Sequence, residues 1–428
     1  MNNNLYNMNK YKKVILSNKA PIITIPVPEA KTATALLIFK TGSRYENKKN
    51  NGISHFLEHL FFKGTLKHPT TLALASELDS LGCEFNAFTS KEYTGYWIKT
   101  AASKLGQALE ILGDMILNSK MAADEIEREK GVIIEELNMY QENPMMHIDD
   151  VLETCLYGDT PAGWETVGTK KNIQNFKRQD FIAYLNSQYG ANSACLIIAG
   201  GIKDKDFKKA TEIVKALKDN KWKKQVKFVS HQTVPTVKTL FKNIDQANLS
   251  LAVRTFPLNH PEEFNVKILS IILGGAMSSR LFINLRERNG LAYYVKTDTE
   301  FYSDSGYLTT QAGVPTEKTK QAVEIILSEY GRLKTELVSK SELKRAKDLL
   351  QGRLLLQMEA TDNLANWYAR QAILRDKIMT PEEFMKKIKA ITPLDLQKTA
   401  KKIFIDKGLN FAAIGRFKEA EFKKVLKF

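Results

Sequence analysis

The chain has 428 residues, a length that suggests two or three domains, and 43% of them are hydrophobic and 26% charged, an ordinary globular composition with ample material for a core. No run approaches the ~20 apolar residues of a membrane-spanning helix, so we expect no membrane-spanning segment. The net charge of +15 is spread along the chain and interleaved with acids, and no zinc-finger or RNA-binding aromatic pattern accompanies it. This charge therefore indicates a solvated surface with a weak attraction for acidic peptides, and we expect no nucleic-acid partner.

Three cysteines, at positions 83, 155 and 195, are too few and too scattered for a disulfide framework or a cysteine-based zinc knuckle. The first 13 residues are rich in Asn and lack both the apolar core of a signal peptide and an Arg-rich presequence. We therefore expect the protein in a reducing compartment, the cytoplasm.

Strand-like and helix-like runs alternate along the chain, which predicts a mixed α/β (α+β) fold. In chain order, the patterns predict a buried strand at 33–40, a helix at 53–63, a helix at 71–81 capped by Gly82, a strand pair at 83–90 and 93–100, helices at 104–117 and 123–140, and a buried strand at 193–199.

The sequence also repeats itself weakly. Residues 107–112 (QALEIL) match 321–326 (QAVEII), and residues 124–130 match 341–347 at nearly the same offset. Matches in the same order at nearly the same offset predict a duplicated domain. We expect a first domain at 1–220, a Lys-rich linker at 221–235 and a homologous second domain at 236–428. Each domain should hold a mixed, largely antiparallel sheet with helices packed on one face.

Two of the six histidines form a metal-binding pattern, His55-Phe-Leu-Glu58-His59. Residues four apart lie on one face of a helix, so both imidazoles can reach one ion. Two neutral imidazoles suit Zn²⁺, and a carboxylate beside a zinc-bound water can take its proton during attack on a carbonyl group. The alternative is an incidental His pair on an amphipathic helix, but Glu58 at this spacing favours the metal site.

A catalytic zinc needs a third protein ligand, and the acidic helix predicted at 123–140 offers candidates. Its apolar stripe places Glu129 and Glu136, seven residues apart, on one shared face, whereas Glu135 points to the far side. Glu136 is the better ligand and Glu129 a supporting carboxylate, although Ile134 blurs the stripe.

These motifs make the chain resemble the pitrilysin/insulysin-type zinc peptidases, and its length is similar to that of their half-length branch, which includes processing peptidases. The resemblance begins with residues 42–46 (GSRYE) and 51–60 (NGISHFLEHL), and continues through residues 82–90, 127–137, 273–282 and 285–295. It implies a zinc-dependent endopeptidase that hydrolyses short or unfolded peptides in an enclosed chamber, with one Zn²⁺ per chain.

The resemblance also implies roles for individual residues. His55, His59 and Glu136 would bind zinc, Glu58 would be the general base and acid, and Glu129 would support them. Asn86, Ala87 and Phe88 match the edge strand to which an extended peptide adds itself. Arg286 and Tyr293 match a pair that, in half-length members, serves the zinc site of a second subunit, which implies a homodimer with composite sites. On sequence alone, the strand residues would be an ordinary strand end and Arg286 an ordinary surface residue.

Two other functions remain open at this point. The chain could be a catalytically silent scaffold or partner subunit of the same fold, although such proteins lose the His pair or the Glu. It could also be a protein that binds nucleic acid or an anionic surface and carries a structural zinc. Three ligands with an adjacent free Glu suit an open catalytic site better than a closed structural one.

Overall fold

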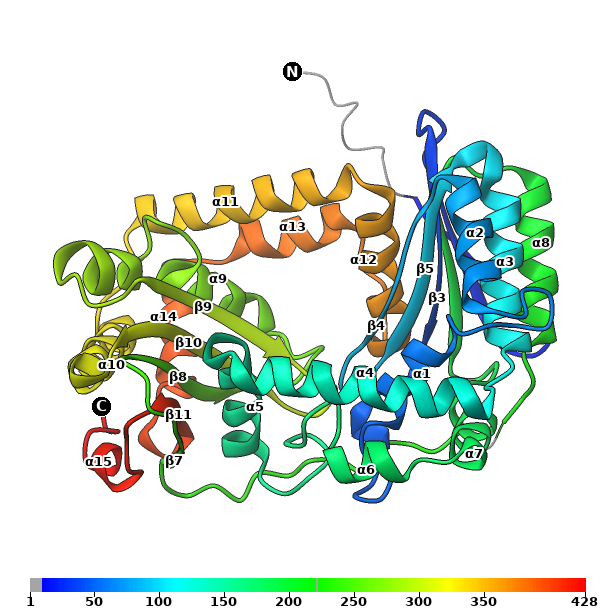
Figure 1. Ribbon diagram of the computed structural model, residues 1–428. Helices are drawn as coiled ribbons and strands as arrows, with labels where there is room; N and C mark the ends of the chain where they lie inside the picture. Colours follow the sequence, from blue (N-terminus) through cyan, green and yellow to red (C-terminus); the bar gives the residue numbers. More distant parts are fainter. Residues whose placement is uncertain (1–9, 221) are drawn as a thin grey trace. The chain divides into compact units, whose positions relative to one another are not determined.

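The computed structural model describes residues 10–220 and 222–428 (Figure 1). Residues 1–9 and Lys221, where the predicted linker begins, lie outside the described residues. Two compact units share the chain, and each draws on both halves of the sequence. Unit 1 comprises residues up to 137, 165–226 and 354–382, and unit 2 comprises residues 138–164, 227–353 and 383–428.

The sheet of unit 1 has six strands in the order β1-β2-β6-β3-β5-β4. All neighbours pair antiparallel except β2 and β6, which are parallel. The central strands are apolar on both faces, as expected for strands covered from both sides. The strands are β1 (Lys12–Ile15), β2 (Pro21–Pro26), β3 (Thr32–Phe39), β4 (Glu84–Thr89), β5 (Thr94–Ala101) and β6 (Ala194–Gly200).

Helices cover both faces of this sheet. On one face α3 (Leu105–Asn118) and α8 (Asp204–Ala216) pack with α1 (Ile53–Leu60), α2 (Thr71–Leu81) and α7 (Arg178–Gln188) in the larger core. On the other face lies α12 (Thr361–Leu374), whose apolar residues form a second core with β2, β3 and β6 (Figure 1). The remaining helices of this unit are the first part of α4 (Ala123–Glu142) and α6 (Lys170–Asn175).

Unit 2 repeats the plan with five strands in the order β7-β11-β8-β10-β9, in which only β7 and β11 are parallel. Its strands are β7 (Thr236–Phe241), β8 (Gln246–Thr255), β9 (Tyr294–Phe301), β10 (Gly306–Pro315) and β11 (Leu409–Gly415). The helices that contact one face are α9 (Glu263–Gly274), α10 (Thr319–Thr335) and α14 (Pro393–Ile403), and α5 (Pro144–Tyr157) contacts β7, β8 and β11 with a separate apolar core. Helices α11 (Lys340–Met358), α13 (Pro381–Ala390) and α15 (Ala420–Lys423) complete the chain.

The structure confirms a mixed fold with a duplicated sheet, but it corrects the expectation of helices on one face alone, because helices pack on both faces of the unit 1 sheet. The predicted strands and helices of the first half match within two residues at each end, except that α1 ends at Leu60 and continues to Lys63 only as a turn. The units also exchange helices: α12, late in the chain, covers the sheet of unit 1, and α5, early in the chain, covers the sheet of unit 2. A single boundary at 221–235 does not describe this exchange of helices. It stays a prediction about where the two duplicated halves of the sequence meet. In the part of the chain that the structure describes, no helix is long and apolar enough to cross a bilayer.

Candidate metal centre

Helix α1 starts at a tightly built turn. Gly52 is its N-cap residue and has a φ of 99°, in the left-handed region, and a Cβ there would lie 2.5 Å from the Val167 carbonyl oxygen. Because Gly52 has no side chain, it cannot accept hydrogen bonds from the first backbone amides of the helix. Glu46 does so instead: its buried carboxylate accepts from the backbone N–H of Gly52 at 2.8 Å and of Ser54 at 2.9 Å. The position of α1 therefore depends on a carboxylate from the preceding loop.

The structure brings His55, His59 and Glu136 together. Their ligand atoms all lie within 4.8 Å of one another, and no other group of three such residues occurs among residues 10–220 and 222–428. His55 Nε2 lies 3.6 Å from Glu136 Oε1, and His59 Nε2 lies 3.3 Å from Glu136 Oε2. Tetrahedral zinc with bonds of ~2.0–2.1 Å separates its ligand atoms by roughly 3.3 Å, so this donor set fits zinc.

Helix α4 supplies the carboxylates of this cluster. Glu136 is half-buried, whereas its neighbour Glu135 is exposed, which is the separation that helical periodicity predicts. One helical repeat earlier, Glu129 is buried, and its Oε1 accepts a hydrogen bond from His59 Nδ1 at 2.9 Å. Its Oε2 accepts from Lys63 Nζ at 2.6 Å. Glu129 therefore fixes the His59 ring in the orientation that leaves Nε2 for Glu136 or a metal ion.

The charges of the cluster shift the pKa of three members. Burial lowers the pKa of His59, but hydrogen bonds to Glu129 and Glu136 outweigh it and raise the pKa to about 9. The pKa of Glu136 is lowered by its contacts with His55 and His59. Burial raises the pKa of Glu129, and the contacts with His59 and Lys63 outweigh it, so the net shift is downward. Both carboxylates are thus held ionised at neutral pH, as metal ligation and its support require.

Glu58 lies on α1 between the two histidines in sequence and is partly exposed. It has no hydrogen-bond or ion-pair partner in the described part of the chain. Its charge acts on the buried pair Tyr96 and Tyr189, whose pKa values are raised mainly by burial and further by Glu58. A carboxylate without a committed partner, one residue from a ligand candidate, is free to exchange protons with a bound molecule.

The three predicted substrate residues lie on β4, the edge strand of the unit 1 sheet, against which α1 packs. Asn86 is exposed, Ala87 is buried, and the ring of Phe88 lies 5.9 Å from that of Tyr93. The Ala87 N–H donates to the Asn86 side chain at 2.8 Å. β4 pairs only with β5 in the described residues, so one of its edges is available for an added strand.

Arg286 and Tyr293 belong to unit 2. Arg286 lies on the π-helical segment η4 (Phe282–Arg288), with its guanidinium 5.0 Å from the Phe282 ring centroid. Tyr293 directly precedes β9 and is 78% exposed. Both side chains are therefore at the surface of their own unit, where they could reach another molecule.

Sequence reasoning did not single out Lys63, and it noted Glu46 only as part of a matching motif. The available signal for Lys63 was its spacing: it follows His59 by four residues and so returns to the same face of the helix. No comparable signal exists for Glu46, because its contact with α1 is made by a loop rather than by a periodic element.

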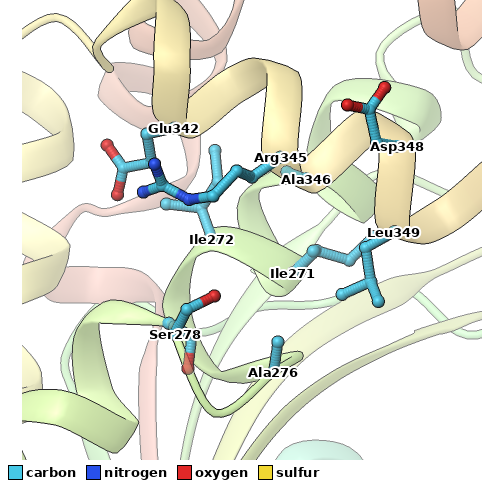
Figure 2. Close-up of a pocket in the computed structure, with 10 residues that line it drawn as sticks. Ile271, Ile272, Ala276, Ser278, Glu342, Arg345, Ala346, Asp348 and Leu349 are labelled. Atoms are coloured by element: carbon cyan, nitrogen blue, oxygen red, sulfur yellow. The ribbon is translucent and has the colours of Figure 1, made fainter.

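A cavity of about 360 Å³ lies in unit 2, between the end of α9, the residues that follow it, and α11 (Figure 2). Ser279, 4% exposed, lines it, and its Oγ has no hydrogen-bond partner in the described residues. None of the predicted site residues lines this cavity. The other lining residues are Ile271, Ile272, Ala276, Ser278, Glu342, Arg345, Ala346, Asp348 and Leu349.

Comparison with known proteins links this geometry to a family. The family model described as "Insulinase (Peptidase family M16)" matches residues 22–170, and the model "Peptidase M16 inactive domain" matches residues 175–350. A protein of Rickettsia felis named "Uncharacterized zinc protease" is 34% identical over 91% of this chain and 94% of its own length.

Two further comparisons extend the likeness. The "Mitochondrial-processing peptidase subunit beta" of Bos taurus is 29% identical over 90% of this chain and 80% of its own length. Among solved structures, a protease from Helicobacter pylori superposes with a TM-score of 0.90, covering 95% of this chain and all of the other. At 21% identity, that superposition concerns the fold alone.

Proposed function

This chain belongs to the M16, or insulinase, family of peptidases, and on that basis we propose that it is a zinc-dependent endopeptidase that hydrolyses short or unfolded peptides. The observation that carries the proposal is the convergence of His55, His59 and Glu136, together with Glu58, which adjoins His59 in sequence and has no hydrogen-bond or ion-pair partner in the described part of the chain. A zinc ion at this site would supply a Lewis acid that lowers the pKa of a bound water to about 7.

The residues of the chain then have defined tasks. Glu58 takes a proton from the attacking water and returns it to the leaving amine, which a carboxylate free of other partners can do. Glu129 holds the His59 ring through Nδ1. The open edge of β4, with Asn86, Ala87 and Phe88, binds the substrate as an added strand and so presents an extended peptide. Folded proteins cannot offer such a strand, so we expect them to resist cleavage.

The decisive experiment compares wild-type protein with Glu58→Gln on a quenched, unfolded peptide, with the zinc content of both measured. We expect about one zinc per chain in both proteins and a loss of roughly 10²–10⁴-fold in kcat for the variant. If both proteins bind zinc and neither cleaves any peptide, the proposal fails. The chain is then a silent partner subunit of the same fold.

The proposal includes a homodimer in which Arg286 and Tyr293 of one chain act at the zinc site of the other. Both side chains are exposed, and a Tyr hydroxyl can donate a hydrogen bond to a developing oxyanion, which supports this part of the proposal. Mixing inactive Glu58→Gln with inactive Tyr293→Phe protein should restore about a quarter of the wild-type activity, because half of the dimers are mixed and each holds one intact site. No recovery despite measured subunit exchange would contradict the composite site.

A further inference from the structure

We propose that Lys63 is a positioning residue for the metal centre, acting through Glu129 on His59. The inference rests on the proposed zinc-dependent function. It adds Lys63 to the site as the residue that positions Glu129, which in turn orients His59. Among the described residues, Lys63 forms no ion pair or hydrogen bond with a ligand candidate, and it contacts the site through the second oxygen of Glu129.

The geometry is a continuous chain of three short contacts. Lys63 Nζ lies 2.6 Å from Glu129 Oε2, Glu129 Oε1 lies 2.9 Å from His59 Nδ1, and His59 Nε2 lies 3.3 Å from Glu136 Oε2. The side chain of Glu129 is only 4% exposed, so water contributes little to its solvation. Within residues 10–220 and 222–428, each of its two oxygens has one partner, and Lys63 is the partner that is not itself a ligand candidate.

Lys63 is important for the position of Glu129 because the Glu129 carboxylate is buried. A carboxylate removed from water needs compensating charge and hydrogen bonds, or it moves toward solvent. With Lys63 in place, one oxygen of Glu129 is anchored and the other is aimed at His59 Nδ1. Without Lys63, Oε2 would be a buried, uncompensated oxygen, and Glu129 would rotate away from the His59 ring. The ring would then lose the contact that directs its Nε2 toward the metal position.

A simpler role for Lys63 must be separated from this one. Lys63 follows the last turn of α1, where a cation stabilises a helix through its dipole in any sequence. A helix-end role would make Lys63 matter for the stability of α1 alone. It would give no reason for the effect of Lys63 on zinc to depend on Glu129, and that dependence is what can be measured.

The test is a double-mutant cycle on zinc affinity. Lys63→Met and Glu129→Gln are made singly and together, and the zinc dissociation constant of each protein is measured by competition with a chromophoric chelator. Outer partners of metal ligands typically change affinity 10–100-fold, so we expect Lys63→Met to weaken zinc binding about tenfold. In the Glu129→Gln background the same substitution should change affinity less than about twofold. Lys63→Arg, which keeps the cation, should stay within about threefold of wild type.

Lys67→Met is the matched control, since Lys67 is exposed and lies four residues further along the chain. It should bind zinc as wild type does. Thermal unfolding of each zinc-free variant shows whether a loss of affinity comes from a loss of fold. Equal weakening by Lys63→Met in both backgrounds, or none in either, overturns the inference and leaves the proposed peptidase intact. A wild type that binds zinc without cleaving peptides overturns the peptidase but leaves the cycle readable, and a wild type that binds no zinc overturns both.

Discussion

The two units share a backbone topology but differ in the side chains that lie between their helices. Strands β2, β6, β3, β5 and β4 of unit 1 correspond in order and pairing to β7, β11, β8, β10 and β9 of unit 2, including the single parallel pair in each sheet. In both units a helix follows the third strand of this order, α1 in unit 1 and α9 in unit 2. A long helix follows later, α4 and α11 respectively. The backbone plan is therefore shared, and the chemistry must come from the side chains between these helix pairs.

In each unit, charged residues connect the long helix to the first helix or to the residues that follow it, but with different partners. In unit 1 the acids of α4 contact two imidazoles of α1 and Lys63 in the turn that follows α1. In unit 2, Arg353 stands on α11 217 residues after Glu136 and donates to the carbonyl oxygen of Gly275 at the end of α9. Glu342, also on α11, binds Arg280 through two hydrogen bonds of 2.8 and 2.9 Å.

The difference between imidazole and guanidinium decides what each bridge can do. A histidine gives up its proton and offers a lone pair to a metal ion, whereas arginine keeps its proton and has no acceptor. At the place of Glu129, unit 2 has Ala346, and a cavity opens there (Figure 2). Unit 2 thus keeps contacts between α11 and the end of α9 but has none of the ligand candidates. The fold therefore does not need metal ligands at these positions.

The largest effect is expected from removing Glu136, the carboxylate ligand candidate of unit 1. Glu136→Gln should weaken zinc binding by more than the ~100-fold upper range of outer partners, because Glu136 contacts both imidazoles, and peptide cleavage should fall with it. Zinc competition and cleavage of a quenched peptide measure both effects. Glu135→Gln, on the adjacent and exposed residue, should leave both unchanged. Equal effects of the two substitutions would show that the face of α4 that carries Glu136 is not the one that binds zinc.

Much of this contrast can be predicted from the sequence. The 3.6-residue period of α4 separates Glu136 from Glu135, and the four-residue spacing in α1 pairs His55 with His59. The weak repeat predicted a duplicated fold, which the two sheets show. These features are local, or repeat a local pattern, so the order of residues contains them.

The features that the sequence did not predict are long-range. The apolar faces of α5 and α12 show that each helix is covered, but not which sheet covers it, so the exchange between units was not foreseen. The same reason applies to Glu46, which reaches the start of α1 from a loop. Lys63 carried a spacing signal, but a lysine near a helix end has an ordinary explanation, and only the 2.6 Å contact with buried Glu129 distinguishes it.

In each unit a buried glutamate lies near the start of the first helix. Glu263, the first residue of α9, accepts from the N–H of Asn259 in the preceding loop, whereas Glu46 lies in a loop and accepts from two backbone amides at the start of α1. Burial raises the pKa of Glu46 from 4.5 to about 7 despite its hydrogen bonds. A folded-state pKa above the unfolded value means that folding takes up a proton between these pH values, so the free energy of unfolding falls as pH rises from about 5 to 7.

The size of this effect is at most about 3 kcal/mol, at ~1.4 kcal/mol for each pKa unit. Urea unfolding of zinc-free wild type and Glu46→Gln across this pH range isolates it, because the difference between the two proteins removes the contribution of other groups. We expect the stability advantage of wild type over Glu46→Gln to shrink steadily as pH rises. Glu29→Gln, on an exposed glutamate, should show no such trend. A difference that is constant with pH would contradict the assignment to Glu46.

The third prediction concerns unit 2, where the bridge should be structural only. Arg280 and Glu342 are 11% and 20% exposed, and Arg280→Met leaves Glu342 without its bidentate partner. Breaking a fully buried ion pair costs ~3–5 kcal/mol, and partial exposure reduces this to about 2 kcal/mol. Lys344→Met, on an exposed pair of the same helix, should cost less than about 0.5 kcal/mol. Urea unfolding measures both, and zinc competition on the folded variants should give the wild-type affinity. Two results would contradict the assignment of a metal-binding cluster to unit 1 and a purely stabilising ion pair to unit 2. One is an unchanged stability of Arg280→Met, and the other is weaker zinc binding by this variant while it is folded.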